Sequence, residues 1–210
     1  MSHRVFDRLY ERYDEWYRRH PIDAWNELLA VREALHGSPG PCLEVGVGTG
    51  WFASKAGCEY GVDPSMGMLR IARARGVEVV LGRGESLPFR DDSFGTVLMV
   101  VTLCFVQDPA RVLEESARVV RRGGRVVPCI VPRESPWGRH YEKLASRGHP
   151  FYSLARFLTV GELVSLLEDA GLRVERMVAT LSYGPEEEPR AEEPRSYSGW
   201  EGFVCIVAGR

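Results

Sequence analysis

Residues 43–50 read Leu-Glu-Val-Gly-Val-Gly-Thr-Gly, and this stretch decides the fold. A short strand-like run leads directly into a turn that contains three glycines. Glycine lets the backbone adopt conformations that other residues avoid, and it lets the backbone pass where a Cβ would collide with a ligand. The helix expected at residues 51–56 would present unpaired N–H groups to an anionic group such as a carboxylate. The segment therefore predicts a nucleotide- or nucleoside-type site.

The glycine spacing separates this turn from the dinucleotide fingerprint. That fingerprint, GxGxxG, needs its third glycine at position 51, which is Trp here. Asp63 follows the next predicted strand, 17 residues after Gly46, where a carboxylate accepts hydrogen bonds from both hydroxyls of a ribose. Together the two features indicate an adenosyl ligand. The alternative is purely structural, with a tight turn at residues 46–50 and an N-cap at Asp63.

Outward from this turn, apolar strand-like runs alternate with amphipathic helical stretches, which is typical of an α/β fold with a mainly parallel sheet. Residues 4–36 are expected to be helical, with a break at Pro21. Strands are expected at residues 42–45, 59–62, 77–81, 96–101, 124–131, 172–181 and 202–208, and further helices at 51–56, 65–75, 110–120 and 159–170. Residues 183–199 are acidic and broken by prolines, so we expect a mobile loop. Because that loop is too short for a crossover helix, the seventh strand should run antiparallel to the sixth.

The length and the net charge of the chain limit the number of domains and the kinds of partner that we expect. A chain of 210 residues predicts a single domain, and a net charge of −2 gives no support for nucleic-acid binding. The first residues are charged and no run approaches about 18 apolar residues, so we expect a soluble, unexported, cytoplasmic protein with no membrane partner. The five cysteines, at 42, 58, 104, 129 and 205, form no CxxC pair. They are expected to be free core residues in a reducing compartment.

The motifs resemble those of the class I S-adenosylmethionine-dependent methyltransferases, in the type 11 branch that includes the ubiquinone/menaquinone C-methyltransferases. The similarity runs through FDRLYERYDEW (6–16), LEVGVGTG, GVDPS (61–65), ESLPFRDDSF (85–94), CFVQDP (104–109), RVVRRGG (118–124) and LLEDAGL (166–172). It implies a doubly wound, Rossmann-like, seven-stranded mixed sheet with an antiparallel strand 7, flanked by helices. The single domain would comprise an N-terminal helical cap (1–38), a cofactor-binding half (39–132) and a substrate-side half (133–210).

The resemblance also assigns cofactor contacts. Residues around the methionine part of S-adenosylmethionine would be Glu44, Gly46, Gly48 and Gly50, with Asp63 on the ribose, Gly84 and Glu85 beside the adenine, and Val100 and Val101 beside the sulfonium. The family often has Asp where this chain has Arg83, and Arg offers no acceptor to the adenine amino group. Either Glu85 substitutes or Arg83 turns outward. No metal is implied.

The acceptor is expected to be a small molecule bound above the carboxyl ends of the strands. Candidate contacts are Tyr10, Tyr13 and Trp16 from the N-terminal helix, and Arg133, Trp137, Tyr141 and Arg156 after the fifth strand. The first three either close the cavity or pack the helix onto the core. Arg133 or Arg156 would bind an anionic group on the acceptor, unless surface carboxylates pair with them. If the acceptor atom is oxygen or nitrogen, the general base would be His20, His140, His149 or a tyrosine of the segments that cover the site.

Two alternatives remain open. One is a non-catalytic module that only binds the cofactor, since no catalytic base is evident. The other is an NAD(P)-dependent oxidoreductase, which Glu44 and the glycine spacing disfavour. Methylation of nucleic acid is also disfavoured, because Pro128-Cys129 falls inside a predicted strand and no N-P-P-aromatic sequence follows the fourth strand.

Overall fold

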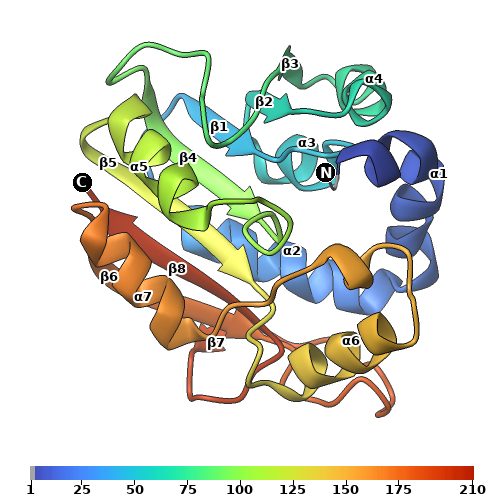
Figure 1. Ribbon diagram of the computed structural model, residues 1–210. Helices are drawn as coiled ribbons and strands as arrows, with labels where there is room; N and C mark the ends of the chain where they lie inside the picture. The colour runs from blue at the N-terminus through green and yellow to red at the C-terminus, as the bar shows by residue number, and fades with distance from the viewer. Residues whose placement is uncertain (1–2) are drawn as a thin grey trace.

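One mixed sheet runs through the part of the chain that the structure describes, residues 3–210 of this computed structural model. Its eight strands lie in the order β3-β2-β1-β4-β5-β8-β6-β7 (Figure 1). They are β1 (Cys42–Val45), β2 (Tyr60–Asp63), β3 (Glu78–Leu81), β4 (Phe94–Val100), β5 (Val120–Ile130), β6 (Arg173–Thr180), β7 (Arg195–Ser196) and β8 (Phe203–Gly209). Strands β1 to β5 pair in parallel, and β8 lies antiparallel between β5 and β6.

The α/β architecture is confirmed, and so is the antiparallel direction of the seventh predicted strand, which is β8. The expected count of seven strands is wrong by one. Strand β7 pairs with the end of β6, with Ser196 opposite Val178 and Arg195 opposite Ala179. It lies in the proline-rich segment expected to be a loop, and a strand of two residues is too short to produce an alternating pattern.

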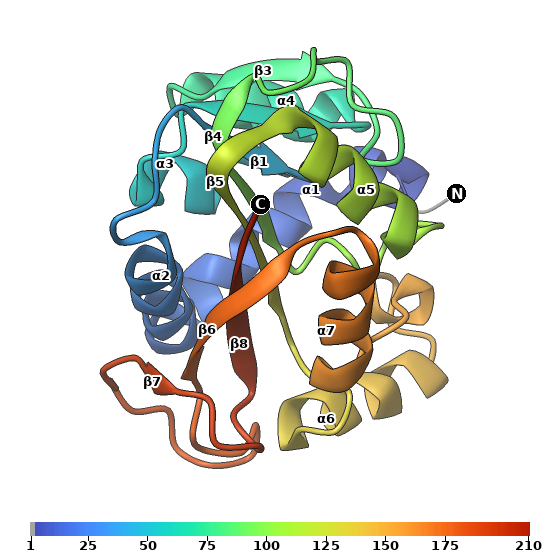
Figure 2. The ribbon, with the colours of Figure 1, turned by 90° about the vertical axis from the view of Figure 1, so that its left-hand side faces the viewer.

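Helices cover both faces of the sheet and one of its ends. They are α1 (His3–Arg19), α2 (Pro21–Leu35), α3 (Trp51–Ala56), α4 (Met66–Ala74), α5 (Pro109–Val119), α6 (Pro136–Ser146), the 3-10 turn η1 (Tyr152–Leu154) and α7 (Val160–Asp169). Helices α2 and α3 lie on one face, and α5 and α7 on the other (Figure 2). Helix α1 lies beyond the carboxyl ends of the parallel strands (Figure 1). None of the helices within residues 3–210 is long and apolar enough to cross a membrane.

The sequence carries the start signals of most of these helices. Pro21 occupies the first turn of α2, where its missing N–H costs no hydrogen bond. Helix α7 begins with a capping box, in which Thr159 and Glu162 satisfy each other's backbone N–H groups. Helix α6 was not expected, yet Ser135 caps it by accepting from the N–H of Gly138. The Ser-Pro pair at 135–136 was the signal that could have located it.

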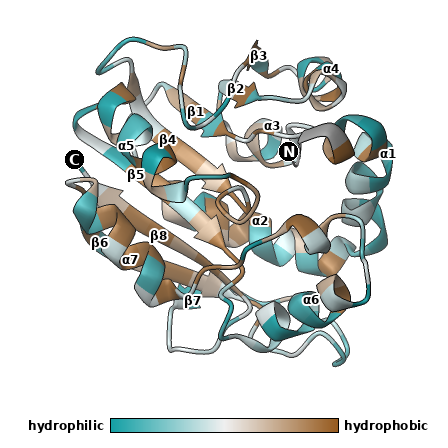
Figure 3. Cartoon of the chain, viewed as in Figure 1, coloured by the Kyte–Doolittle hydropathy of each residue, from teal (hydrophilic) through white to brown (hydrophobic). Residues whose placement is uncertain are grey.

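The core consists of two apolar layers, one on each face of the sheet. Neighbouring residues of β5 alternate between them, with Val127 in the layer under α2 and Val126 in the layer under α5 and α7. Strand β8 does the same with Val207 and Ile206. The strands are accordingly hydrophobic along their length, while the outer sides of the helices are hydrophilic (Figure 3). Burying both faces is what makes the strands nearly continuous apolar runs in the sequence.

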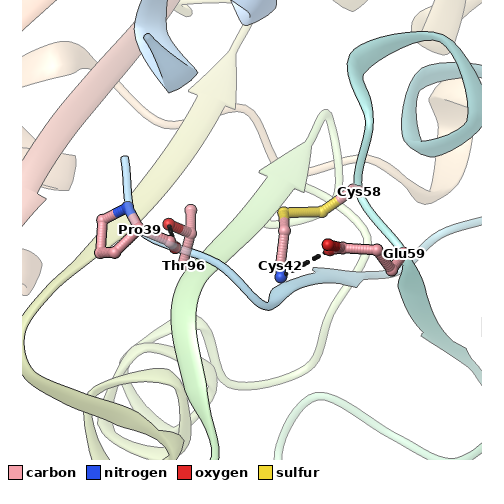
Figure 4. The surroundings of a disulfide bond; sticks show 5 residues. All are labelled: Pro39, Cys42, Cys58, Glu59 and Thr96. Atoms are coloured by element: carbon pink, nitrogen blue, oxygen red, sulfur yellow. Dashed lines mark hydrogen bonds between the residues drawn. A yellow bond between two sulfur atoms is a disulfide. The ribbon is translucent and has the colours of Figure 1, made fainter. Parts of the chain in front are cut away.

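The expectation of five free cysteines is wrong. Cys42 and Cys58 form one disulfide bond, shown in Figure 4, and Cys129 and Cys205 form another. The Cα atoms of the second pair are 3.9 Å apart because the two residues oppose each other on β5 and β8. Cys104 is free and buried. The pairing depends on strand register, which cysteine spacing along the chain does not reveal.

Candidate active site

The glycine turn after β1 adopts backbone conformations that require glycine. Gly46 has a φ of +72°, and a Cβ on it would lie 2.3 Å from Cγ2 of Thr102. Gly50 also has a φ of +72°, and a Cβ there would lie 2.9 Å from the backbone of Ala72 in α4. The missing side chain of Gly46 therefore lets Thr102, just after β4, pack against the turn. The missing side chain of Gly50 lets α4 approach the start of α3.

Asp63 ends β2 beside this turn. Its carboxylate accepts hydrogen bonds from the N–H of Gly48 at 3.0 Å and from the N–H of Ser65 at 2.8 Å. Burial raises the pKa of Asp63 to about 6, and the two N–H donors limit that rise. Each oxygen keeps a lone pair that can accept from a hydroxyl group. Asp63 is therefore held in a fixed orientation as an acceptor.

A cavity, here called the first cavity, opens above the turn. Of the residues that the sequence assigned to the cofactor, seven line it: Gly46, Gly48, Asp63, Gly84, Glu85, Val100 and Val101. The structure adds residues that sequence reasoning missed, among them Phe6, Met68, Thr102, Phe105 and Gln107. The Oγ1 of Thr102 donates to the carbonyl of Val45 at 3.1 Å, which ties the end of β4 to the glycine turn.

Glu44 and Gly50 are not among the residues that line the first cavity. Gly50 serves the close helix approach described above. Glu44 is 2% exposed, and burial raises its pKa while the backbone N–H of Ala53 opposes that rise. Its Oε2 has no hydrogen-bond partner among the described residues. Glu44 therefore lies behind the glycine turn, with one carboxyl oxygen left unsatisfied among the described residues.

Arg83 and Glu85 both line the first cavity, and the side chain of Arg83 is 48% exposed at its rim. The Nε of Arg83 lies 3.5 Å from an Oε of Glu85, and the N–H of Gln107 donates to the other oxygen at 3.1 Å. Burial raises the pKa of Glu85, but the hydrogen bonds and Arg83 outweigh it, so the net pKa is lowered. Glu85 therefore presents an ionised acceptor at this end of the cavity.

Helix α1 is attached over the cavity by two aspartates that sequence reasoning missed. Asp7 accepts from the Oγ of Ser65 at 2.6 Å and from the N–H of Gly67 at 3.2 Å. Asp14 accepts from the Oγ1 of Thr49 at 2.7 Å and forms an ion pair with Arg75. Both residues lie within FDRLYERYDEW, at the spacing of two helical turns. The polar face of α1 is thus bound to the glycine turn and to the start of α4.

A second cavity, of about 240 Å³, adjoins the first. Its walls carry nine aromatic side chains: Tyr13, Trp16, Tyr17, Phe52, Phe105, Tyr141, Phe151, Tyr152 and Phe157. Three residues, Tyr13, Val101 and Phe105, line both cavities. Val101 has a φ of +50°, which is rare and strained for a β-branched residue, and its N–H donates to the carbonyl of Cys129 at 2.8 Å. The strained residue therefore lies where the two cavities meet.

The structure brings some of the predicted acceptor residues together and not others. Tyr13, Trp16 and Tyr141 line the second cavity. Trp137 lines an adjoining hollow, where its Nε1 donates to the carbonyl of Tyr183 at 2.7 Å. Tyr10 instead packs against Gly67 of α4.

The two predicted anion-binding arginines are not among the residues that line these cavities. Arg133 forms an ion pair with Glu162 at 3.2 Å, and Arg156 is exposed. The structure therefore has the surface pairing that was the alternative to anion binding by Arg133. Of the predicted bases, His20 and His149 line the second cavity and His140 lines the adjoining hollow. Burial lowers the pKa of His149.

Comparison with known proteins agrees with the resemblance noted in the sequence. Residues 43–127 match the family described as "Methyltransferase domain". A crystal structure of a SAM-dependent methyltransferase from Thermotoga maritima, described as a possible histamine N-methyltransferase, superposes with a TM-score of 0.94 at 40% identity, over 100% of this chain and 99% of that one. An uncharacterized protein of Mycobacterium tuberculosis is 43% identical over 93% of this chain and 70% of its own length. A demethylmenaquinone methyltransferase of Bacillus mycoides is 27% identical over 81% of this chain and 86% of its own.

Proposed function

The chain belongs to the S-adenosylmethionine-dependent methyltransferases, and we propose that it methylates a small molecule bound in the second cavity. The first cavity takes the cofactor, with Asp63 on the ribose and the glycine turn beside the methionine part. The observation that supports this arrangement is the wall shared by the two cavities at Tyr13, Val101 and Phe105. A methyl group leaving the first cavity at that wall enters the second one directly.

The residues of the first cavity fit the cofactor. Asp63 offers carboxylate oxygens for the two ribose hydroxyls, and Glu85 accepts at the adenine end. Glu44 and Gly50, which the sequence also assigned to the methionine part, would act from behind the turn, by shaping it. Bound S-adenosylmethionine supplies an activated methyl group on a sulfonium ion. The chain's own contribution is to position the acceptor on the axis of displacement and to exclude water, which lowers the barrier by about 7–11 kcal/mol in favourable cases.

Helix α1 and the segment with α6 and η1 would enclose the acceptor. Tyr13 and Trp16 come from α1, and Tyr141 and Tyr152 from α6 and η1. A site closed by aromatic side chains suits a small apolar or cationic molecule, and it suits neither a polynucleotide nor a membrane surface. We also place the enzyme in the cytoplasm. Its two disulfide bonds are unusual for that compartment, where glutathione and thioredoxin keep most thiols reduced.

Calorimetric titration with S-adenosylmethionine and S-adenosylhomocysteine tests the proposal, with NAD as the control ligand. Both adenosyl ligands should bind and NAD should not. Release of S-adenosylhomocysteine in the presence of an acceptor would separate an enzyme from a module that only binds the cofactor. The relative's description names an amine, so amines are among the first acceptors to try. Folded protein that binds neither adenosyl ligand would refute the proposal.

A further inference from the structure

Glu27 is a carboxyl group inside the aromatic second cavity. It lies in the middle of α2, is 5% exposed and lines the cavity together with the nine aromatic side chains. Within residues 3–210 its carboxyl makes no hydrogen bond and no ion pair in the structure. Buried carboxyl groups without partners are rare, because removing a charge from water costs far more than dispersion contacts return.

Among the described residues that line the cavity, no cationic side chain pairs with Glu27. The charged group that acts on it is Asp23, one helical turn earlier, which is also acidic. Arg12 and Arg19 line the cavity but are exposed, and Arg19 is paired with Glu15 at 3.0 Å. The adjoining hollow adds further carboxyl groups, Glu186 and Glu187. Glu187 is paired with Arg190 at 3.5 Å, so the unpaired acidic group at the cavity wall is Glu27.

Aromatic faces around a carboxyl group form an environment that favours an organic cation. The negative face of a Tyr or Trp ring attracts an ammonium group within about 6 Å, and the attraction is strongest where water is excluded. With an ammonium group beside it, the Glu27 carboxyl would ionise and complete such a site with a negative charge. A neutral acceptor would use the rings but would leave Glu27 mostly protonated near neutral pH, because burial raises its pKa to about 8.

We propose, on the premise of the function above, that the acceptor is a small amine whose ammonium group binds Glu27 among the aromatic side chains. When the amine is bound, the Glu27 carboxylate takes one proton from the ammonium and leaves a neutral nitrogen with a free electron pair. That pair forms the new bond to the methyl carbon while the carbon–sulfur bond breaks and its electrons stay on sulfur. The products are a methylated ammonium and a neutral thioether, and the Glu27 proton leaves to solvent.

The titratable groups around Glu27 are compatible with this role. Burial raises the pKa of Glu27 to about 8, with Asp23 adding to the rise. Tyr13 and Tyr17 from α1, Tyr141 from α6 and Tyr152 from η1 also face it, and burial raises the pKa of each above 10. They stay neutral at physiological pH. The other titratable groups at the cavity wall are Arg12, Glu15, Arg19, His20 and His149.

The test compares amines with alcohols of the same shape. Protein saturated with S-adenosylhomocysteine is titrated with primary amines from methylamine to 2-phenylethylamine, and with the matching alcohols up to 2-phenylethanol. The wild type should bind at least one amine at least about tenfold more tightly than its matching alcohol, as expected for a charged buried contact. Methyl transfer from S-adenosylmethionine to that amine is then followed by mass spectrometry.

The decisive variant is Glu27→Gln, which keeps the shape and removes the charge. It should bind S-adenosylhomocysteine as the wild type does, lose at least about tenfold in amine affinity and lose the preference over the alcohol. The matched control is Glu33→Gln, on the exposed side of the same helix. Failure to bind S-adenosylhomocysteine would refute the proposed function itself. Normal cofactor binding with no bound amine, with alcohols preferred, or with an unaffected Glu27→Gln would refute the amine site alone.

Discussion

Asp14 of α1 and Arg75, directly after α4, form a two-pronged ion pair, with Nη1 2.7 Å from Oδ1 and Nη2 2.9 Å from Oδ2. The same Arg75 donates to the carbonyl of Thr49 at 2.8 Å, while the hydroxyl of Thr49 donates to Asp14. The three residues form a small hydrogen-bond network between α1 and the glycine turn. Because the side chains are mostly buried, this pair is worth more than an exposed one.

We predict that Asp14→Asn weakens S-adenosylhomocysteine binding by about tenfold, because α1 loses its attachment to the glycine turn. Limited proteolysis should also cut residues 3–19 faster. Calorimetry measures the affinity. Glu11→Gln, an exposed residue of the same helix, is the control and should stay within about twofold of the wild type, as surface changes usually do. Unchanged affinity in Asp14→Asn would mean that the network does not support the cofactor site.

Asp63→Ala should reduce the affinity for S-adenosylhomocysteine by about tenfold or more, since two ribose hydroxyls lose their acceptor. In the wild type the affinity should also fall as the pH drops from 7 to 5, because the Asp63 carboxyl, with a pKa of about 6, takes up a proton. The variant should lack that component of the pH dependence. Asp169→Ala at the exposed end of α7 serves as the control. An affinity within a factor of about three of the wild type would disprove the ribose contact.

Glu27→Gln should make the protein more stable at alkaline pH. The folded protein raises the pKa of Glu27 from 4.5 to about 8, so it binds this proton more tightly than the unfolded chain does. Wild-type stability is therefore lost as the pH rises from 4.5 towards 8, by at most about 1.4 kcal/mol per pH unit. Denaturant unfolding at pH 5, 6.5 and 8 should show the variant gaining on the wild type. Parallel curves for the two proteins would contradict the burial of an unpaired Glu27.

Denatured, unreduced protein should expose one titratable thiol, that of Cys104, and reduced protein should expose five. Reduction should also lower the melting temperature. The bonds join residues 16 and 76 positions apart, and loops of such lengths stabilise by about 3 to 4.5 kcal/mol in the chain-entropy treatment. Ellman titration and a thermal scan with and without reductant provide the measurements. Five thiols without reductant would restore the expectation of free cysteines.

The fold follows closely from local signals. The predicted strand at 42–45 and the predicted helix at 51–56 coincide with β1 and α3, because both carry short-range patterns bounded by glycines. The segment 131–157 carries weaker local signals, and its helices were not predicted from the sequence. Its aromatic and polar residues belong to α6, η1 and the loops between them, and their apolar sides face a cavity rather than the sheet. No continuous apolar stripe marks such elements.

The sequence by itself determined the glycine turn after β1 and the acceptor Asp63 at the end of β2. These residues lie close together in the chain, and each has a conformational or chemical requirement of its own. Only the tertiary structure decided what lies opposite them. In the sequence, Glu27 is one of three acidic residues of α2. Only the packing of α1, α6 and η1 surrounds it with aromatic rings. The cysteine pairs and the attachment of Asp14 to Arg75 depend on register and packing in the same way. Contacts between distant segments arise from how elements pack, and a one-dimensional pattern of hydropathy does not encode which buried charge will lack a partner.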